Sequence, residues 1–68
     1  MKDALLVSVI MPTYNSAEFI SAAIQSVQKQ TYFNWELWII DDASTDFTIA
    51  SIENFVSLDS RIKLLKNL

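Results

Sequence analysis

Three aspartates lie close together where the second apolar run of the chain ends. Asp41 and Asp42 directly follow the run at 36–40, and Asp46 comes four residues later. A helix cap needs only one side chain, and two adjacent carboxylates repel each other. The pair therefore indicates that these carboxylates bind a ligand, a cation or a buried hydrogen-bond donor. Asp46, by contrast, is typical of a simple cap in the first turn of a helix.

A second set of candidate side chains follows the first apolar run. It comprises Pro12, Thr13, Tyr14 and Asn15. A tyrosine ring and a carboxylate that face one crevice suit a nucleobase, since the base can stack on the ring while the aspartate accepts a ring N–H. Uracil, with its N3–H between two carbonyls, is such a base. The alternative is that Tyr14 only packs against its own loop.

The elements that must position these loops follow from the apolar pattern. Strands are predicted at 5–11, 36–40 and 61–65, and the continuous first run is typical of a strand buried on both faces of a parallel sheet. Apolar residues at three- and four-residue steps predict a helix from about 17 to 30 and another from about 45 to 57. Ser16 is the expected cap of the first helix, and Ser44 or Thr45 that of the second.

The order β-α-β-α-β predicts an α/β fold, a three-stranded parallel sheet of Rossmann-like type. Right-handed crossovers make the strands parallel and bring their carboxyl ends to one rim. Both candidate loops should lie on that rim, within reach of one ligand.

Composition excludes several classes of protein. The 68 residues contain no Cys and no His, so a disulfide framework and a thiolate or imidazole zinc site are excluded. They also contain no Gly, which excludes a Walker loop and a dinucleotide-binding glycine fingerprint. Five basic residues and a net charge of −3 make nucleic acid an unexpected partner. No run is long enough to span a bilayer, and the expected location is cytoplasmic.

Two separated blocks carry a specific resemblance. They are VSVIMPTYN at 7–15 and WELWIIDDASTD at 35–46, with IQSV at 24–27 and QT at 30–31 between them. Together they resemble the amino-terminal segment of the family 2 glycosyltransferases, inverting enzymes of the GT-A fold that use nucleotide-diphosphate sugars. The resemblance covers nearly the whole chain. It implies that this half of the domain binds the nucleotide.

The resemblance also implies site residues. Pro12, Thr13, Tyr14 and Asn15 would line the base and ribose pocket. Asp42 would accept the uracil N3–H, Asp41 would be a loop carboxylate behind it, and Ser44 would cap or shape the loop. Ala43 stands where the common family form has Gly, which makes the backbone there less permissive.

Two family elements do not occur in the 68 residues: an Asp-x-Asp that holds the metal and diphosphate, and a later catalytic carboxylate. Residues 1–68 are therefore expected to be the nucleotide-binding part of one longer catalytic domain, inactive alone and without metal ligands. For the full-length enzyme the resemblance implies Mn or Mg, a UDP-sugar donor, a glycan or lipid-linked acceptor, and a peripheral position at the cytoplasmic membrane face. With one flank of its first strand open, the chain alone is expected to self-associate.

Two other functions compete with this interpretation. One is a receiver-like module whose acidic pair binds Mg²⁺, although the segment at 61–68 supplies no phosphoacceptor aspartate. The other is a purely structural self-association domain, which leaves Tyr14, Asn15 and Asp42 without a role.

Overall fold

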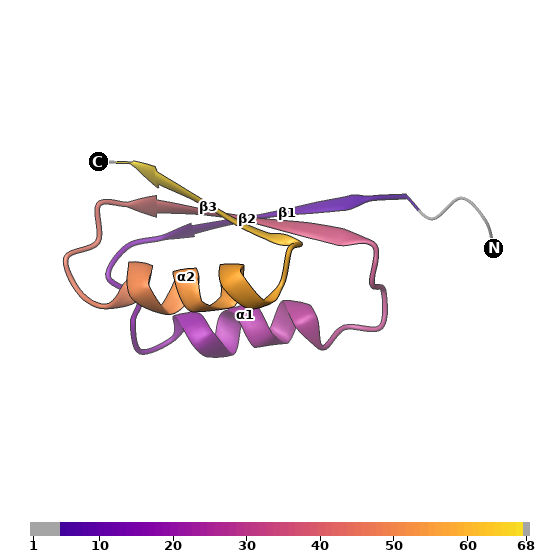
Figure 1. The fold of residues 1–68 in the computed structure, drawn as a ribbon, viewed down its shortest axis with the longest axis horizontal. Helices are drawn as coiled ribbons and strands as arrows, with labels where there is room; N and C mark the ends of the chain where they lie inside the picture. Colours follow the sequence, from indigo (N-terminus) through magenta and orange to yellow (C-terminus); the bar gives the residue numbers. More distant parts are fainter. Residues whose placement is uncertain (1–4, 68) are drawn as a thin grey trace.

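The computed structural model describes residues 5–67, which form a three-stranded parallel sheet with two helices packed on it (Figure 1). The elements are β1 (Val7–Thr13), α1 (Ile20–Gln28), β2 (Trp35–Asp42), α2 (Thr48–Leu58) and β3 (Ile62–Asn67). The strand order is β1-β2-β3, and both neighbouring pairs are parallel. This confirms the predicted β-α-β-α-β order and the parallel sheet.

The core lies between the sheet and the two helices. Its fully buried members are Ile20, Ile24, Trp35, Leu37, Ile39, Ile52 and Ile62. Side chains of the central strand alternate, so that Leu37 and Ile39 are buried under the helices while Trp38 and Ile40 point to the other face. The helical stripes and the strand alternation thus meet in one apolar layer.

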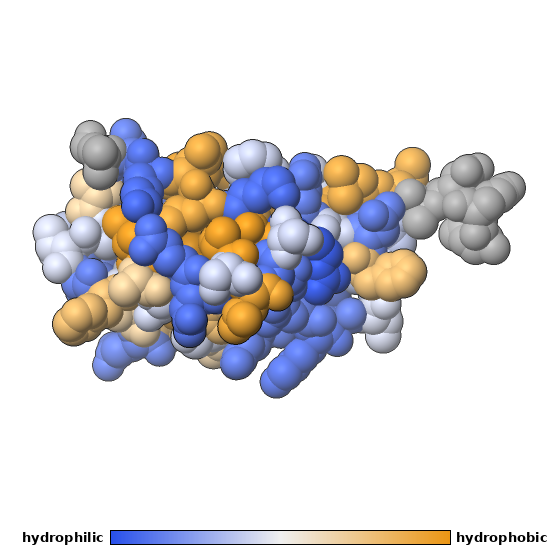
Figure 2. Space-filling model, in the orientation of Figure 1, coloured by the Kyte–Doolittle hydropathy of each residue, from blue (hydrophilic) through white to orange (hydrophobic). Residues whose placement is uncertain are grey.

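Only one face of the sheet is covered by helices (Figure 1). In the strand order β1-β2-β3 both crossovers run in the same direction across the sheet, and crossovers of the usual right-handed sense then place both helices on the same side. The prediction that the first strand is buried on both faces is therefore wrong for the described residues: Ser8 is exposed, and 58% of Ile10 is exposed. Figure 2 accordingly shows hydrophobic side chains at the surface among hydrophilic ones.

The helices begin later than predicted. Residues 17–19 form a turn in which the Ser16 carbonyl accepts the amides of Phe19 and Ile20, and α1 begins at Ile20. The Ser16 hydroxyl donates to the Tyr14 carbonyl, so it does not cap α1. α2 begins at Thr48, whose amide donates to the Asp46 carboxylate at 2.9 Å. Asp46 therefore contacts the start of α2 as predicted, but it precedes the helix and does not lie in its first turn.

The strands extend further towards the candidate loops than predicted. β1 ends at Thr13, β2 at Asp42 and β3 at Asn67, each two residues beyond the apolar run. The parallel register continues through these polar ends, pairing Thr13 with Asp41 and Asp42 with Asn67. Backbone pairing with a neighbouring strand stabilises the polar ends in an extended conformation, which side-chain hydropathy does not reveal.

Candidate functional site

The two candidate loops leave the sheet side by side at the carboxyl ends of β1 and β2 (Figure 1). Because Thr13 is paired with Asp41 in the parallel register, the residues that follow each strand, from Tyr14 and from Asp42 onward, share one rim. The expected juxtaposition of the two loops is therefore present.

Asp41 is the buried anchor of this rim. Its side chain is fully buried and accepts hydrogen bonds from the Thr13 hydroxyl at 2.7 Å, the Ser44 amide at 2.9 Å and the Ser44 hydroxyl at 2.6 Å. Burial alone would raise the pKa of Asp41, but these bonds outweigh it and hold the pKa below its ordinary value. Asp41 is therefore a charged, internally satisfied group that joins β1 to the loop after β2.

Ser44 and Thr45 extend this connection to the first loop. The Asn15 amide donates to the Ser44 hydroxyl oxygen at 2.8 Å, and the Thr45 amide donates to Asn15 Oδ1 at 2.8 Å. The predicted role of Ser44 or Thr45 as a helix cap is wrong, because these bonds direct both residues to Asp41 and Asn15 instead. Asn15 itself has a left-handed backbone, with φ of 46°.

Asp46 and Thr48 add a third connection. The Ser16 amide donates to the Thr48 hydroxyl at 2.7 Å, and the Ala17 amide donates to Asp46 Oδ2 at 3.3 Å. Hydrogen bonds, foremost from the Thr48 hydroxyl, lower the pKa of Asp46. The start of α2 is thus fixed to the turn before α1.

The remaining candidate side chains are exposed on the same rim. Tyr14 is 59% exposed, and Pro12 and Asp42 are exposed as well. By strand alternation Pro12 and Asp42 lie on the helix-free face, opposite to Thr13 and Asp41. The rim therefore presents an aromatic ring and a carboxylate to solvent above a base of internal hydrogen bonds.

Asn67 was not among the residues that the sequence singled out. Its Nδ2 donates to Asp42 Oδ1 at 3.1 Å from the end of β3. The predicted topology could have indicated Asn67, because the third parallel strand ends at the same rim as the other two. Thr48, a buried hydroxyl in the first turn of α2, gave no comparable signal.

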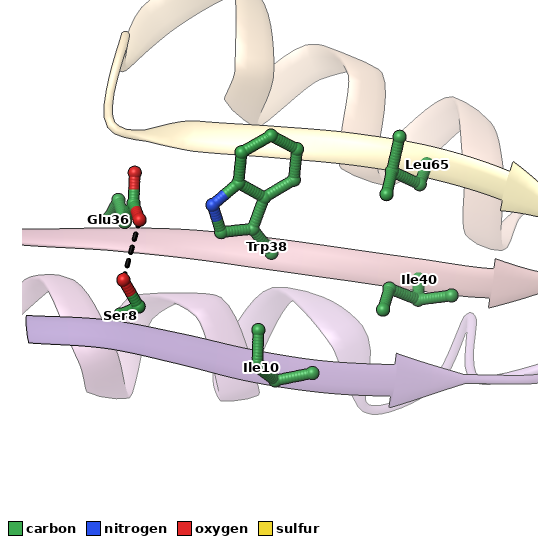
Figure 3. Close-up of a pocket in the computed structure, with 6 residues that line it drawn as sticks. All are labelled: Ser8, Ile10, Glu36, Trp38, Ile40 and Leu65. Carbon is green, nitrogen blue, oxygen red and sulfur yellow. Dashed lines mark hydrogen bonds between the residues drawn. The ribbon is translucent and has the colours of Figure 1, made fainter.

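A hollow of about 390 Å³ lies on the helix-free face of the sheet (Figure 3). It is lined by Ser8, Ile10, Glu36, Trp38, Ile40 and Leu65. Its polar members bind each other: the Ser8 hydroxyl donates to Glu36, which is the main cause of the lowered pKa of that carboxyl. The hollow is part of an uncovered apolar sheet face, and we assign it no ligand.

Within residues 5–67, no group of three or more acidic side chains is placed to hold a metal ion. The carboxylates at the rim are instead engaged by the donors described above. Neither helix of the described chain has the length and hydropathy needed to cross a bilayer.

Known proteins provide an independent comparison. The model of the family described as "Glycosyl transferase family 2" matches residues 8–67. An Escherichia coli protein named UDP-Glc:alpha-D-GlcNAc-diphosphoundecaprenol beta-1,3-glucosyltransferase WfgD is 57% identical over 96% of this chain and 25% of its own length. The putative teichuronic acid biosynthesis glycosyltransferase TuaG of Bacillus subtilis is 40% identical over 88% of this chain and 24% of its own.

A solved structure shares the fold. The mannosyltransferase PcManGT from Pyrobaculum calidifontis, in complex with GDP-Man and Mn²⁺, superimposes with a TM-score of 0.81 at 29% identity. The match covers 90% of this chain and 19% of that one. The chain thus spans about a quarter or less of the length of these relatives.

Proposed function

Because the chain belongs to glycosyl transferase family 2, we propose that it supplies the nucleotide-binding part of a glycosyltransferase that uses a nucleotide-diphosphate sugar. The observation that carries the proposal is the parallel pairing of Thr13 with Asp41, after which Tyr14 and Asp42 follow on one rim, both exposed. Ligands of open α/β sheets bind at the carboxyl ends of the strands.

In the proposed complex, Tyr14 stacks on the base and Asp42 accepts a ring N–H. Asn67 already donates to Oδ1 of Asp42, so we assign the base N–H to Oδ2. A hydrogen bond to an ionised carboxylate is stronger than one between neutral groups, which favours bases with an N–H at this edge. Pro12 lies on the same face as Asp42 and would border the base.

We propose uridine as the nucleoside and a lipid-linked glycan as the acceptor. Support comes from the WfgD relative, whose printed name gives UDP-Glc as donor and a diphosphoundecaprenol-linked sugar as acceptor. PcManGT was solved with GDP-Man, and guanine also carries a ring N–H beside a carbonyl. Adenine carries a ring acceptor at that edge instead, so adenosine diphosphate is the discriminating control. A membrane-bound acceptor is consistent with a peripheral position at the cytoplasmic membrane face, which belongs to the same proposal.

The described residues do not fit the divalent cation of the full-length enzyme. Asp41 and Asp46 each already accept several hydrogen bonds, and Asp42 accepts one from the Asn67 side chain. We therefore place the cation, with Mn²⁺ in PcManGT as the precedent, on residues outside 5–67. No catalytic residue is assigned to the chain.

We further propose that residues 1–68 are part of one larger catalytic domain and that, alone, they self-associate. Among the described strands only β2 pairs with β1, so the other edge of β1 is open. Ile10 and Leu65 add exposed apolar surface on the helix-free face. Open strand edges and contiguous apolar patches are sites of association.

Titration with nucleotides tests the proposed function. Uridine diphosphate should shift the backbone amide signals at 13–15 and 41–44, with an affinity on the order of 1 mM, equivalent to about −4 kcal/mol. Adenosine diphosphate should cause much smaller shifts. The size of the response to guanosine diphosphate, compared with that to uridine diphosphate, shows which of the two nucleotides the site prefers. Equal responses to uridine and adenosine diphosphate, or shifts only outside the rim, would contradict the proposal.

A further inference from the structure

We propose that Asn15 is a positioning residue: it fastens the loop after β2 to the loop after β1, and so sets the spacing of Tyr14 and Asp42 without contacting the nucleotide. The inference rests on the proposed function, because the spacing matters only if those two side chains share a ligand. It assigns Asn15 a different role from the pocket-lining one that the family resemblance implies.

The contacts of Asn15 run in both directions between the loops. Its backbone amide donates to Ser44 Oγ at 2.8 Å, while its Oδ1 accepts the Thr45 amide at 2.8 Å and the Thr45 hydroxyl at 3.4 Å. A backbone amide can only donate, so the side-chain atom that faces Thr45 must be the oxygen. The orientation of the Asn15 amide group is therefore fixed by its partner.

The backbone of Asn15 is adapted to this role. Its φ of 46° lies in the left-handed region, which asparagine tolerates better than most residues other than glycine. Asparagine therefore combines two properties here: a backbone that turns at this point and an acceptor that reaches Thr45. Aspartate shares both properties, whereas glycine keeps only the first.

The far end of the connection is anchored. Ser44 is bonded to the Asp41 carboxylate by both its amide and its hydroxyl, and Asp41 is fully buried. Asn15 therefore holds Ser44 and Thr45 against a fixed support. Tyr14 precedes Asn15 directly and Asp42 precedes Ser44 by two residues, so the two proposed ligand-binding side chains flank the connection.

Asn15→Asp and Asn15→Gly separate positioning from direct contact. Asn15→Asp keeps the acceptor for Thr45 and should bind uridine diphosphate within about twofold of the wild type. Asn15→Gly keeps the left-handed backbone but loses the acceptor, and should bind about fivefold to tenfold more weakly, the equivalent of roughly one net hydrogen bond. A side-chain amide that donated to the nucleotide would give another pattern, since a carboxylate would repel the diphosphate and Asn15→Asp would then be the weaker variant.

Affinities are fitted to the amide signals of the folded protein, so a loss of stability alone does not change them. Without nucleotide, the Thr45 amide should exchange with solvent faster in Asn15→Gly and at the wild-type rate in Asn15→Asp. Wild-type affinity in Asn15→Gly, or weaker binding in Asn15→Asp than in Asn15→Gly, would overturn the positioning role alone. No response of the wild-type rim to uridine diphosphate would overturn the proposed function, and the positioning role with it.

Discussion

The Thr13 hydroxyl donates a 2.7 Å hydrogen bond to the Asp41 carboxylate across the ends of β1 and β2, and both residues are buried. Asp42, the next residue, points to the opposite face because side chains alternate along a strand. The two adjacent acids therefore have separate environments: Asp41 joins the loops from inside, and Asp42 is exposed at the rim. This separation explains how two neighbouring carboxylates coexist.

Substitution of Asp41 should destabilise the fold. Asp41→Asn replaces one acceptor oxygen by an NH₂ group that faces the donors of Thr13 and Ser44, leaving buried donors without partners. We expect a loss of about 2–3 kcal/mol in the free energy of unfolding, a large part of the stability of so small a domain. Urea unfolding monitored by tryptophan fluorescence measures this loss, because the buried Trp35 becomes exposed to water on unfolding.

The matched control is Glu53→Gln. Glu53 forms an exposed ion pair with Lys66 at 3.0 Å, and such surface pairs contribute about 0–1 kcal/mol. If Asp41→Asn were no more destabilising than Glu53→Gln, the anchoring role of Asp41 would be wrong.

The scaffold was predictable from the sequence because apolar periodicity determines the order of elements and right-handed crossovers determine their direction. Residue types at the rim already predicted a nucleobase between Tyr14 and an aspartate, and the family resemblance then distinguished Asp42 from Asp41. The helix starts were not predictable, although Ser16, Ser44 and Thr45 are good cap residues. The Ser16 amide donates to the Thr48 hydroxyl, the Ser44 hydroxyl oxygen accepts the Asn15 amide, and the Thr45 amide donates to Asn15 Oδ1. Local preference was overridden by tertiary contacts of 29 to 32 residues in separation.

Ala43 offers a test of backbone strain. It has a φ of 55°, in the left-handed region that disfavours a residue with a Cβ atom. Ala43→Gly should relieve that cost, which outweighs the larger backbone entropy of glycine in the unfolded chain, and raise the free energy of unfolding by about 0.5–1 kcal/mol.

The same substitution at Ala50, an exposed position inside α2, is the control. There glycine should destabilise by about 1 kcal/mol, because helix propensity falls and no strain is relieved. Destabilisation of similar size at both positions would show that Ala43 is not strained.

Stability should fall in acid because of Asp59 and Asp41. Hydrogen bonds from the Arg61 guanidinium, with a further one from Gln28, hold the pKa of Asp59 well below its ordinary value. A carboxyl whose pKa is lower in the folded state stabilises the fold above its unfolded pKa of about 3.9, and this stabilisation is lost as the pH falls towards the folded pKa. The urea midpoint should therefore drop steadily below about pH 5.

Asp59→Asn tests the contribution of that one group. The variant should be less stable than the wild type at pH 7, and the difference should shrink as the pH falls towards 2. A constant difference over this range would exclude Asp59 as a source of the acid sensitivity.

Self-association should depend on the uncovered sheet face as well as on the β1 edge. Ile10→Lys places a charge on that face and should reduce the apparent mass at high concentration, measured by light scattering. Ser21→Lys adds the same charge on an exposed position of α1 and should leave association unchanged. A wild-type chain that stays monomeric at high concentration would contradict the proposal itself.

The central claim is that Asp42 accepts a ring N–H of the nucleotide base. Its most direct test compares uridine diphosphate with its N3-methyl analogue, which lacks that N–H, on the wild type and on Asp42→Asn. We predict that the wild type binds uridine diphosphate several-fold more tightly than the analogue, and that Asp42→Asn nearly abolishes the preference. An equal preference in both proteins would contradict the account.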